Sequence, residues 1–276
     1  HFLYKQRQSG EFRVYDPTYI VQPHIAALYG LEVITGYHPA IYKRHLDLYR
    51  RMWKDDKSDI IQQYMHRIDE VASPVILDLM NLKYFVDFGR PQSNNYREVY
   101  RFMHPRGQCF VYERKSVLPR AFVVARAQLP PPGTTVLDAL PLINPKEYCL
   151  VEDEPFEGAA AYQPLDIERD GPADITMKFT ITQPGVAVIS QSWHPDWCAT
   201  DNGQPVKVRC VNHNFVGVAL PPGEHTLRVW YWPWDFYVGL GVSVLGILTI
   251  ALVTVLAHHR KRSTADQTVT VSIGAS

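Results

Sequence analysis

The side chains best suited to chemistry gather in one short stretch near the end of the chain's polar part. Trp193, His194, Asp196 and Trp197 lie within five residues, and His213 follows near the end of a strand-like run. Indole faces can stack on sugar rings while imidazole and carboxylate groups bind hydroxyls, so this cluster is a candidate ligand site. The competing interpretation is a structural turn with both tryptophans packed into a β-sandwich, and we weigh it more heavily.

Metal and cofactor chemistry find little support in the sequence. No two His, Asp or Cys residues share a convincing ligand spacing on one element, and no Gly-rich phosphate loop, G-x-S-x-G elbow or H-E-x-x-H occurs. We therefore expect no metal and no cofactor, and we assign no catalytic residue. A second candidate site is the basic face of a helix, which would contact lipid phosphate or a polyanion. Such charges are more often simply solvated. The basic residues are Lys43, Arg44, Arg50, Arg51 and Lys54.

The four cysteines are candidates for disulfides. Cys198 and Cys210 flank Asn202-Gly203, a strong turn signal, and would face each other across a hairpin. Cys109 and Cys149 both lie in strand-like runs and form a second candidate pair. An oxidising exterior compartment would favour both bridges, and buried free thiols are the alternative.

The elements that must position these residues change character along the chain. Apolar residues recur at helical spacing from Ile41 to Met52 and again from about Asp59, and Ser73-Pro74 supplies an N-cap and first-turn proline for a third helix. From about Tyr96 short strand-like runs alternate with turns such as Asn202-Gly203, a pattern typical of a β-sandwich. We expect an α+β fold: a mixed region over 1–95, helical in character, and an antiparallel sandwich over 96–231.

One membrane-spanning helix is expected over 232–258. The run from Phe236 to Ala257 carries no charge and is long enough for a hydrocarbon core of about 30 Å. Aromatic residues precede it and basic residues follow it, an order that places the bulk of the chain outside the cell and the tail 259–276 in the cytoplasm. The expected interface residues are Trp230, Trp232, Trp234, Arg260, Lys261 and Arg262.

Composition limits the partners. The 276 residues include 28 basic and 28 acidic ones, so nothing in the net charge indicates nucleic acid. The chain begins with His1, yet the expected topology requires export, so we expect a removed leader or upstream membrane helices in a longer protein. Gly239, Ser243 and Gly246 form a small-residue stripe that would pack against such helices or against a second copy of the chain; the alternative is that glycine is simply frequent in membrane helices.

Several motifs together resemble a known family. The segments are Gly185 to Trp197, Asn202 to Pro205, Gly217 to His225 and Tyr231 to Ser243, with upstream agreement in Gly36 to Pro39, Asp78 to Tyr84, Tyr112-Glu113 and Leu118 to Phe122. In this order they are similar to the terminal exterior domain and last helix of the YfhO-like bacterial membrane proteins. Asp196 departs from the glycine that the family usually has, which puts the geometry of that turn in doubt.

The resemblance implies a multi-pass parent protein similar to the GT-C glycosyltransferases, whose catalytic acid would lie in a region outside this chain. The role implied here is accessory to sugar transfer from a lipid-linked donor to cell-envelope polymers, in the bacterial cell membrane. Its expected partners are membrane lipid, a lipid-linked sugar or envelope glycan, and upstream transmembrane helices. Two alternatives remain: a single-pass carbohydrate-binding or sensor protein, and an exterior enzyme with a dispersed site.

Overall fold

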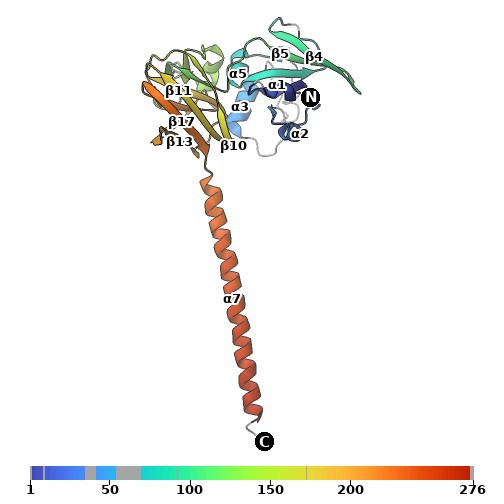
Figure 1. Cartoon of the computed structure of the whole chain (residues 1–276), viewed down its shortest axis with the longest axis vertical. Coiled ribbons are helices and arrows are strands. Elements are labelled where there is room, and N and C mark those ends of the chain that lie inside the picture. Colours follow the sequence, from blue (N-terminus) through green and yellow to red (C-terminus); the bar gives the residue numbers. More distant parts are fainter. Residues whose placement is uncertain are drawn as a thin grey trace. The chain divides into compact units, whose positions relative to one another are not determined.

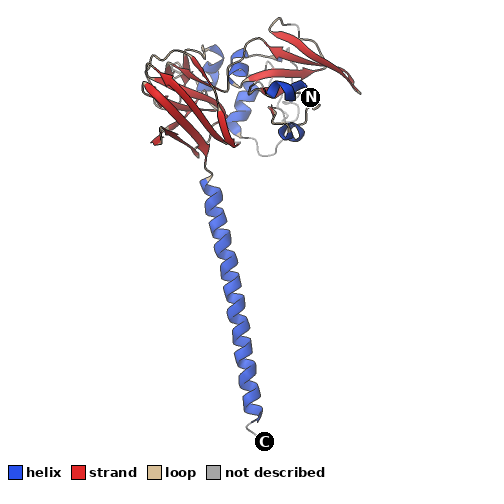
Figure 2. Cartoon of the chain, viewed as in Figure 1, coloured by secondary structure: helices blue, strands red, loops and turns tan. Residues whose placement is uncertain are grey.

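A computed structural model describes residues 2–8, 10–34, 42–53, 70–91, 93–171 and 173–273, without the side chains of Asp170 and of 258–273. The chain divides into two compact units, His1–Tyr231 and Trp232–Ser276. Figure 1 traces the order of the elements, and Figure 2 shows the first unit to be rich in strands and the second to be helical.

The first part of the large unit is a five-stranded mixed sheet in the order β2-β1-β3-β5-β4. The short strand β1 (Arg13–Tyr15) runs parallel to β2 (Glu32–Val33) and β3 (Leu82–Asp87), and β5 (Gly107–Arg114) pairs antiparallel with β3 and β4 (Tyr96–His104). The described helices of this part are α1 (Phe2–Arg7), α2 (Pro23–Leu28), α3 (Lys43–Arg51) and α5 (Pro74–Leu79). The mixed sheet therefore extends past residue 95, because β4 and β5 pair with β3 rather than with the sandwich.

Two of the three expected helices are confirmed. In α3 the apolar spacing buries Leu48 and Tyr49 against the core. At α5 the Ser73 hydroxyl accepts a hydrogen bond from the Ile76 N–H, as an N-cap does. The helix expected from about Asp59 falls outside the described residues, as do Gly36 to Pro39 and Lys54.

The second part is an antiparallel sandwich, as expected. One sheet has the order β10-β11-β17-β13-β14 and the other β15-β16-β12-β6-β9. Their strands are β6 (Ala121–Val124), β9 (Gln163–Leu165), β10 (Glu168–Gly171), β11 (Asp174–Ile181), β12 (Gly185–Ser192), β13 (Trp197–Asp201), β14 (Gln204–Val206), β15 (Val208–Val211), β16 (Phe215–Leu220) and β17 (Gly223–Tyr231). A small parallel pair, β7 (Arg126–Gln128) and β8 (Tyr148–Leu150), and the short helices α6 (Val136–Ala139) and η2 (Leu140–Leu142) also belong to this unit.

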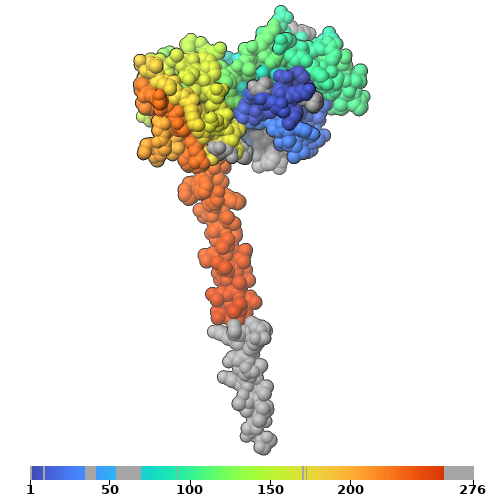
Figure 3. Space-filling view, in the orientation of Figure 1, coloured from blue at the N-terminus to red at the C-terminus, as the bar shows by residue number. Residues whose placement is uncertain are grey.

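The second sandwich sheet is buried on both faces. Along β12, Ala187 and Ile189 pack into the core between the two sheets, whereas Val186 and Val188 pack into the core shared with α3 and α5. Strand side chains alternate between faces, so a strand covered on both sides has to be apolar throughout. Figure 3 shows the N-terminal part, blue to green, and the sandwich, yellow to orange, packed side by side.

Neither expected disulfide is present, since all four cysteines are free thiols. The Asn202-Gly203 hairpin does form, but it pairs Ala199 with Val206, and Cys210 lies farther on, in β15 of the opposite sheet. Cys109 and Cys149 are separated similarly, because β5 belongs to the mixed sheet and β8 to the small parallel pair. The turn at Asn202-Gly203 was therefore predicted correctly. The disulfide does not form because the chain passes to the opposite sheet before it reaches Cys210.

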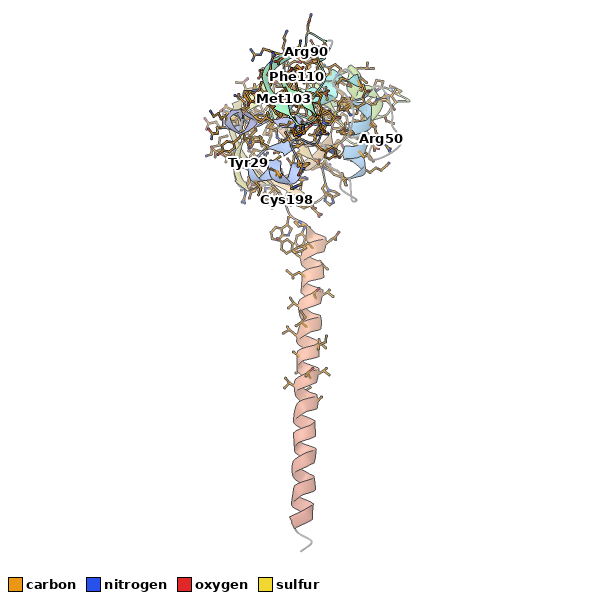
Figure 4. All side chains as sticks on the ribbon, turned by 90° about the vertical axis from the view of Figure 1, so that its right-hand side faces the viewer. Tyr29, Arg50, Arg90, Met103, Phe110 and Cys198 are labelled. Carbon is orange, nitrogen blue, oxygen red and sulfur yellow. The ribbon has the colours of Figure 1, made fainter. Side chains whose placement is uncertain are left out.

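The second unit contains one long helix, α7 (Trp234–Ile273). Its stretch from Trp234 to Ala257 is long and apolar enough to cross a membrane and is not buried against the protein. Apolar side chains project from this stretch on all sides (Figure 4), as expected of a helix in contact with lipid. Just before the helix, Trp232 stacks on Tyr237 with ring centroids 4.3 Å apart.

Candidate functional site

A cavity of about 330 Å³ lies where the mixed sheet meets the sandwich. We call it the interface cavity. Its N-terminal wall comes from β1, α2, β2 and α3, and its other wall from the ends of β12 and β16. It is lined by Arg13, Pro23, Ala27, Leu31, Glu32, Val33, Ile34, His45, Met80, Ser192, Asn214 and Phe215. Apolar walls with a few convergent polar groups are the usual composition of a small-molecule site.

Arg13 is fixed firmly at this junction. Its Nε donates to Glu32 at 3.1 Å, its Nη1 donates to the Met80 carbonyl at 3.0 Å, and both terminal nitrogens donate to Ser190, at 2.9 Å to the hydroxyl and 2.7 Å to the carbonyl. A charged residue in a buried strand requires such partners. Arg13 thus ties β1 to β12 and holds the two walls of the cavity together.

His45 contributes an imidazole from α3. Burial, together with the positive charge of Arg13, lowers the pKa of His45 to about 4. The ring is therefore neutral at physiological pH, with one nitrogen able to donate a hydrogen bond and the other able to accept one.

Asn214 contributes the most conspicuous polar atom. The residue is buried, and its Nδ2 donates to the Ser192 hydroxyl at 3.4 Å. Its Oδ1 is buried as well and has no hydrogen-bond partner among the described residues. A buried carbonyl oxygen without a partner is costly, so this position favours a ligand that can donate a hydrogen bond.

The sequence-predicted cluster is not brought together as one site. Trp197 is buried in the sandwich core and donates from its indole to the Ser192 carbonyl at 2.9 Å. Trp193 packs against the same core, and its backbone N–H donates to the Asn214 carbonyl at 2.9 Å. Both tryptophans therefore fit the structural interpretation of the turn, and they support the cavity wall through neighbouring residues.

Of the polar members of that cluster, His194 and Asp196 remain together, whereas His213 faces a different element. The His194 ring contacts Tyr42 and Tyr231, and its Nδ1 accepts the backbone N–H of Asp196 at 3.2 Å, which stabilises the turn where the family usually has glycine. His213 faces α3 instead, with its Nε2 3.5 Å from the Asp47 carboxylate. Burial and the nearby Arg44 lower the pKa of His213.

One of the basic helix residues has a structural role. Both terminal nitrogens of Arg44 donate to Glu152, at 2.6 and 2.7 Å, and its guanidinium lies 5.6 Å from the centre of the Trp193 ring. The hydrogen bonds that Arg44 donates to Glu152 raise the pKa of Arg44. This residue fastens α3 to the sandwich, so it is engaged with protein rather than solvated.

Comparison with protein families gives one match. The family described as "Bacterial membrane protein YfhO" matches residues 159–243, which run from before β9 through the rest of the sandwich into α7. Over these residues the chain is YfhO-like. Comparisons with curated proteins and with solved structures give no match.

The YfhO-like region contributes only one wall of the interface cavity. Ser192, Asn214 and Phe215 lie inside the matched residues, whereas Arg13, Glu32 and His45 lie outside them. The region also reaches ten residues into the helix that can cross a membrane. The chain thus combines a β-rich unit, similar to YfhO from residue 159 onward, with an apolar C-terminal helix.

Sequence reasoning missed the residues of the N-terminal wall. Neither Arg13 nor His45 was among the candidate site residues. The available signal was their polarity, because an ionisable residue on a face otherwise apolar needs a partner or a function.

Proposed function

We propose that the large unit is an extracytoplasmic binding domain, held to the bacterial cell membrane by α7, that takes a hydroxyl-bearing ligand in the interface cavity. The observation that carries this proposal is the polar set on an otherwise apolar wall: Asn214 with an unpartnered buried oxygen, the neutral His45, and the Arg13–Glu32 pair. Hydroxyl groups both donate and accept hydrogen bonds, so a sugar suits these groups.

The membrane side of this proposal rests on charge. The basic run His258 to Arg262 follows the apolar stretch of α7, and basic residues accumulate on the cytoplasmic side. The role we assign is accessory to the transfer of sugars from a lipid-linked donor to envelope polymers, with the domain binding donor or acceptor. Catalysis would belong to a separate part of the transferase.

The experiment is a binding titration on the full chain in detergent, with monosaccharides and fragments of envelope glycan as probes. Ala27 lines the cavity on an exposed part of α2, so Ala27→Trp should obstruct the cavity without disturbing the core. We expect this variant to weaken binding by roughly tenfold or more, since buried contact area is lost.

The matched control is Leu28→Trp, one residue along at a position that is 83% exposed and does not line the cavity. It should bind as the wild type does. Equal binding by both variants, or no binding of any probe to the wild type, would reject the interface cavity as the site.

A further inference from the structure

The carboxylate of Glu32 is shared by three guanidinium groups. Arg13 Nε donates to its Oε2 at 3.1 Å, Arg120 Nη1 lies 3.0 Å from the same oxygen, and Arg169 Nη2 donates to Oε1 at 3.4 Å. Among the described residues that line the interface cavity, Glu32 is the acidic one. Its negative charge is therefore more than balanced at the cavity wall.

A second carboxylate does not restore the balance. Glu11 pairs with Arg169 at 2.5 and 2.9 Å and with Arg7 at 3.0 Å, and Arg120 Nε lies 3.8 Å away. Even without Arg169, three guanidiniums (Arg7, Arg13 and Arg120) share these two carboxylates among the described residues, which leaves an excess of positive charge.

That excess lies in a region with little water. The Arg120 side chain is 4% exposed and the Arg13 side chain 12% exposed. Burial, and to a lesser extent the neighbouring Arg13, lower the pKa of Arg120 to about 9. Charges interact more strongly where the dielectric constant is low, so the field of the network extends into the adjoining cavity.

Two carboxylates in or near α3, Glu152 and Asp47, do not neutralise this excess positive charge at the cavity wall. Glu152 is held by Arg44, and Asp47 faces His213. Neither carboxylate lines the cavity.

We infer that the ligand of the interface cavity is acidic: a small sugar that carries a carboxylate or a phosphate, with its anionic group toward the Arg13 side and its hydroxyls toward Asn214 and His45. The inference rests on the proposed function for the location of the site and adds the charge of the ligand. A carboxylate and a phosphate would both supply the negative charge, and the experiment below distinguishes between them.

The test compares four probes by calorimetric titration of the full chain in detergent at fixed ionic strength: glucuronate, glucose 6-phosphate, glucose and glucosamine. We expect an acidic probe to bind roughly tenfold more tightly than glucose, and glucosamine to bind most weakly, because one unit charge near a partly buried excess charge contributes on the order of that factor. The tighter of the two acidic probes identifies the anionic group.

A charge-changing variant provides an independent measurement. Glu32→Gln keeps an oxygen acceptor and removes the negative charge, so the preference of the protein for glucuronate over glucose should increase about threefold or more. The matched control is Glu168→Gln, which removes the same charge from an exposed residue paired with Lys178. It should change the preference by less than about twofold, as expected for a screened surface charge.

The outcomes separate the two levels of the proposal. If glucose binds the wild type as tightly as the acidic probes, the inference about charge is wrong and the cavity remains a sugar site. An unchanged or reduced preference in Glu32→Gln would also overturn the inference about charge. If none of the four probes binds, the proposed function fails together with it.

Discussion

His45 shows how one residue can serve both folding and binding. It lies on the same helix as the buried residues Leu48 and Tyr49 and lines the interface cavity. Its pKa is about 4 in the folded chain, because of burial and the charge of Arg13, against an ordinary value near 6.5. Between these values the unfolded chain takes up a proton that the folded chain does not.

This difference fixes the sign of a pH effect. The contribution of a neutral His45 is complete above about pH 6.5 and is lost as the pH falls toward 4. We expect the free energy of unfolding to fall by up to about 3 kcal/mol over that range, and His45→Gln to remove most of the loss. Urea unfolding at a series of pH values measures it. The control is His24→Gln in α2, at an exposed position, which should leave the pH dependence of the free energy of unfolding unchanged. An equal pH dependence in the wild type and His45→Gln would show that His45 is not the group responsible.

At the same scale, residue type alone predicted roles poorly. The Trp193 to Trp197 segment was chosen for its aromatic and ionisable side chains, yet its tryptophans serve the core and its neighbours Ser192 and Asn214 reach the cavity. The alternation of residues along a strand shows which side chains share a face of the sheet. The face that borders the cavity is decided by the packing of the N-terminal part against the sandwich.

Among the elements, β16 illustrates a packing limit. Gly217 lies in this strand, and a Cβ placed on it would come within 2.3 Å of Cγ1 of Val211 in β15. The side of the sheet that Gly217 faces carries the core shared with the N-terminal part, where Val211 is fully buried. The glycine of the motif Gly217 to His225 is therefore explained by close packing, not by chemistry.

We expect Gly217→Ala to lower the free energy of unfolding by roughly 1–3 kcal/mol, as overpacking does. Val211→Ala frees the space that the new methyl group needs, so the double variant should be more stable than the sum of the two single effects predicts. Denaturant unfolding of the four proteins in this cycle measures the coupling. Simple additivity of the two changes would show that the contact with Val211 is not the cause.

Local signals in the sequence predicted most of the elements and failed where pairing between distant segments decides. The Ser73 cap, the Asn202-Gly203 turn and the strands of the sandwich follow from neighbouring residues. The assignment of β4 and β5 to the mixed sheet depends on the pairing of β5 with β3, and the two-residue strand β2 depends on its pairing with β1. Such non-local contacts leave little periodicity within a single segment.

For the whole molecule, the division into two units leads to a direct expectation. The compact unit ends at Tyr231, and the apolar helix belongs to the other unit. A chain that ends at Tyr231 should therefore remain in aqueous solution without detergent and unfold cooperatively, whereas the full chain should sediment with membranes. Ultracentrifugation and thermal unfolding check both; an aggregated or unfolded His1–Tyr231 chain would show that the large unit needs the helix to fold.

The position of β17 has a consequence for how the protein is made. This strand is central in its sheet, between β11 and β13, and it ends at Tyr231, three residues before α7 begins. During synthesis from the N-terminus, the sheet lacks its middle strand until the chain just ahead of the membrane helix has emerged. The large unit therefore cannot complete its sandwich until the residues directly before the apolar helix have been synthesised.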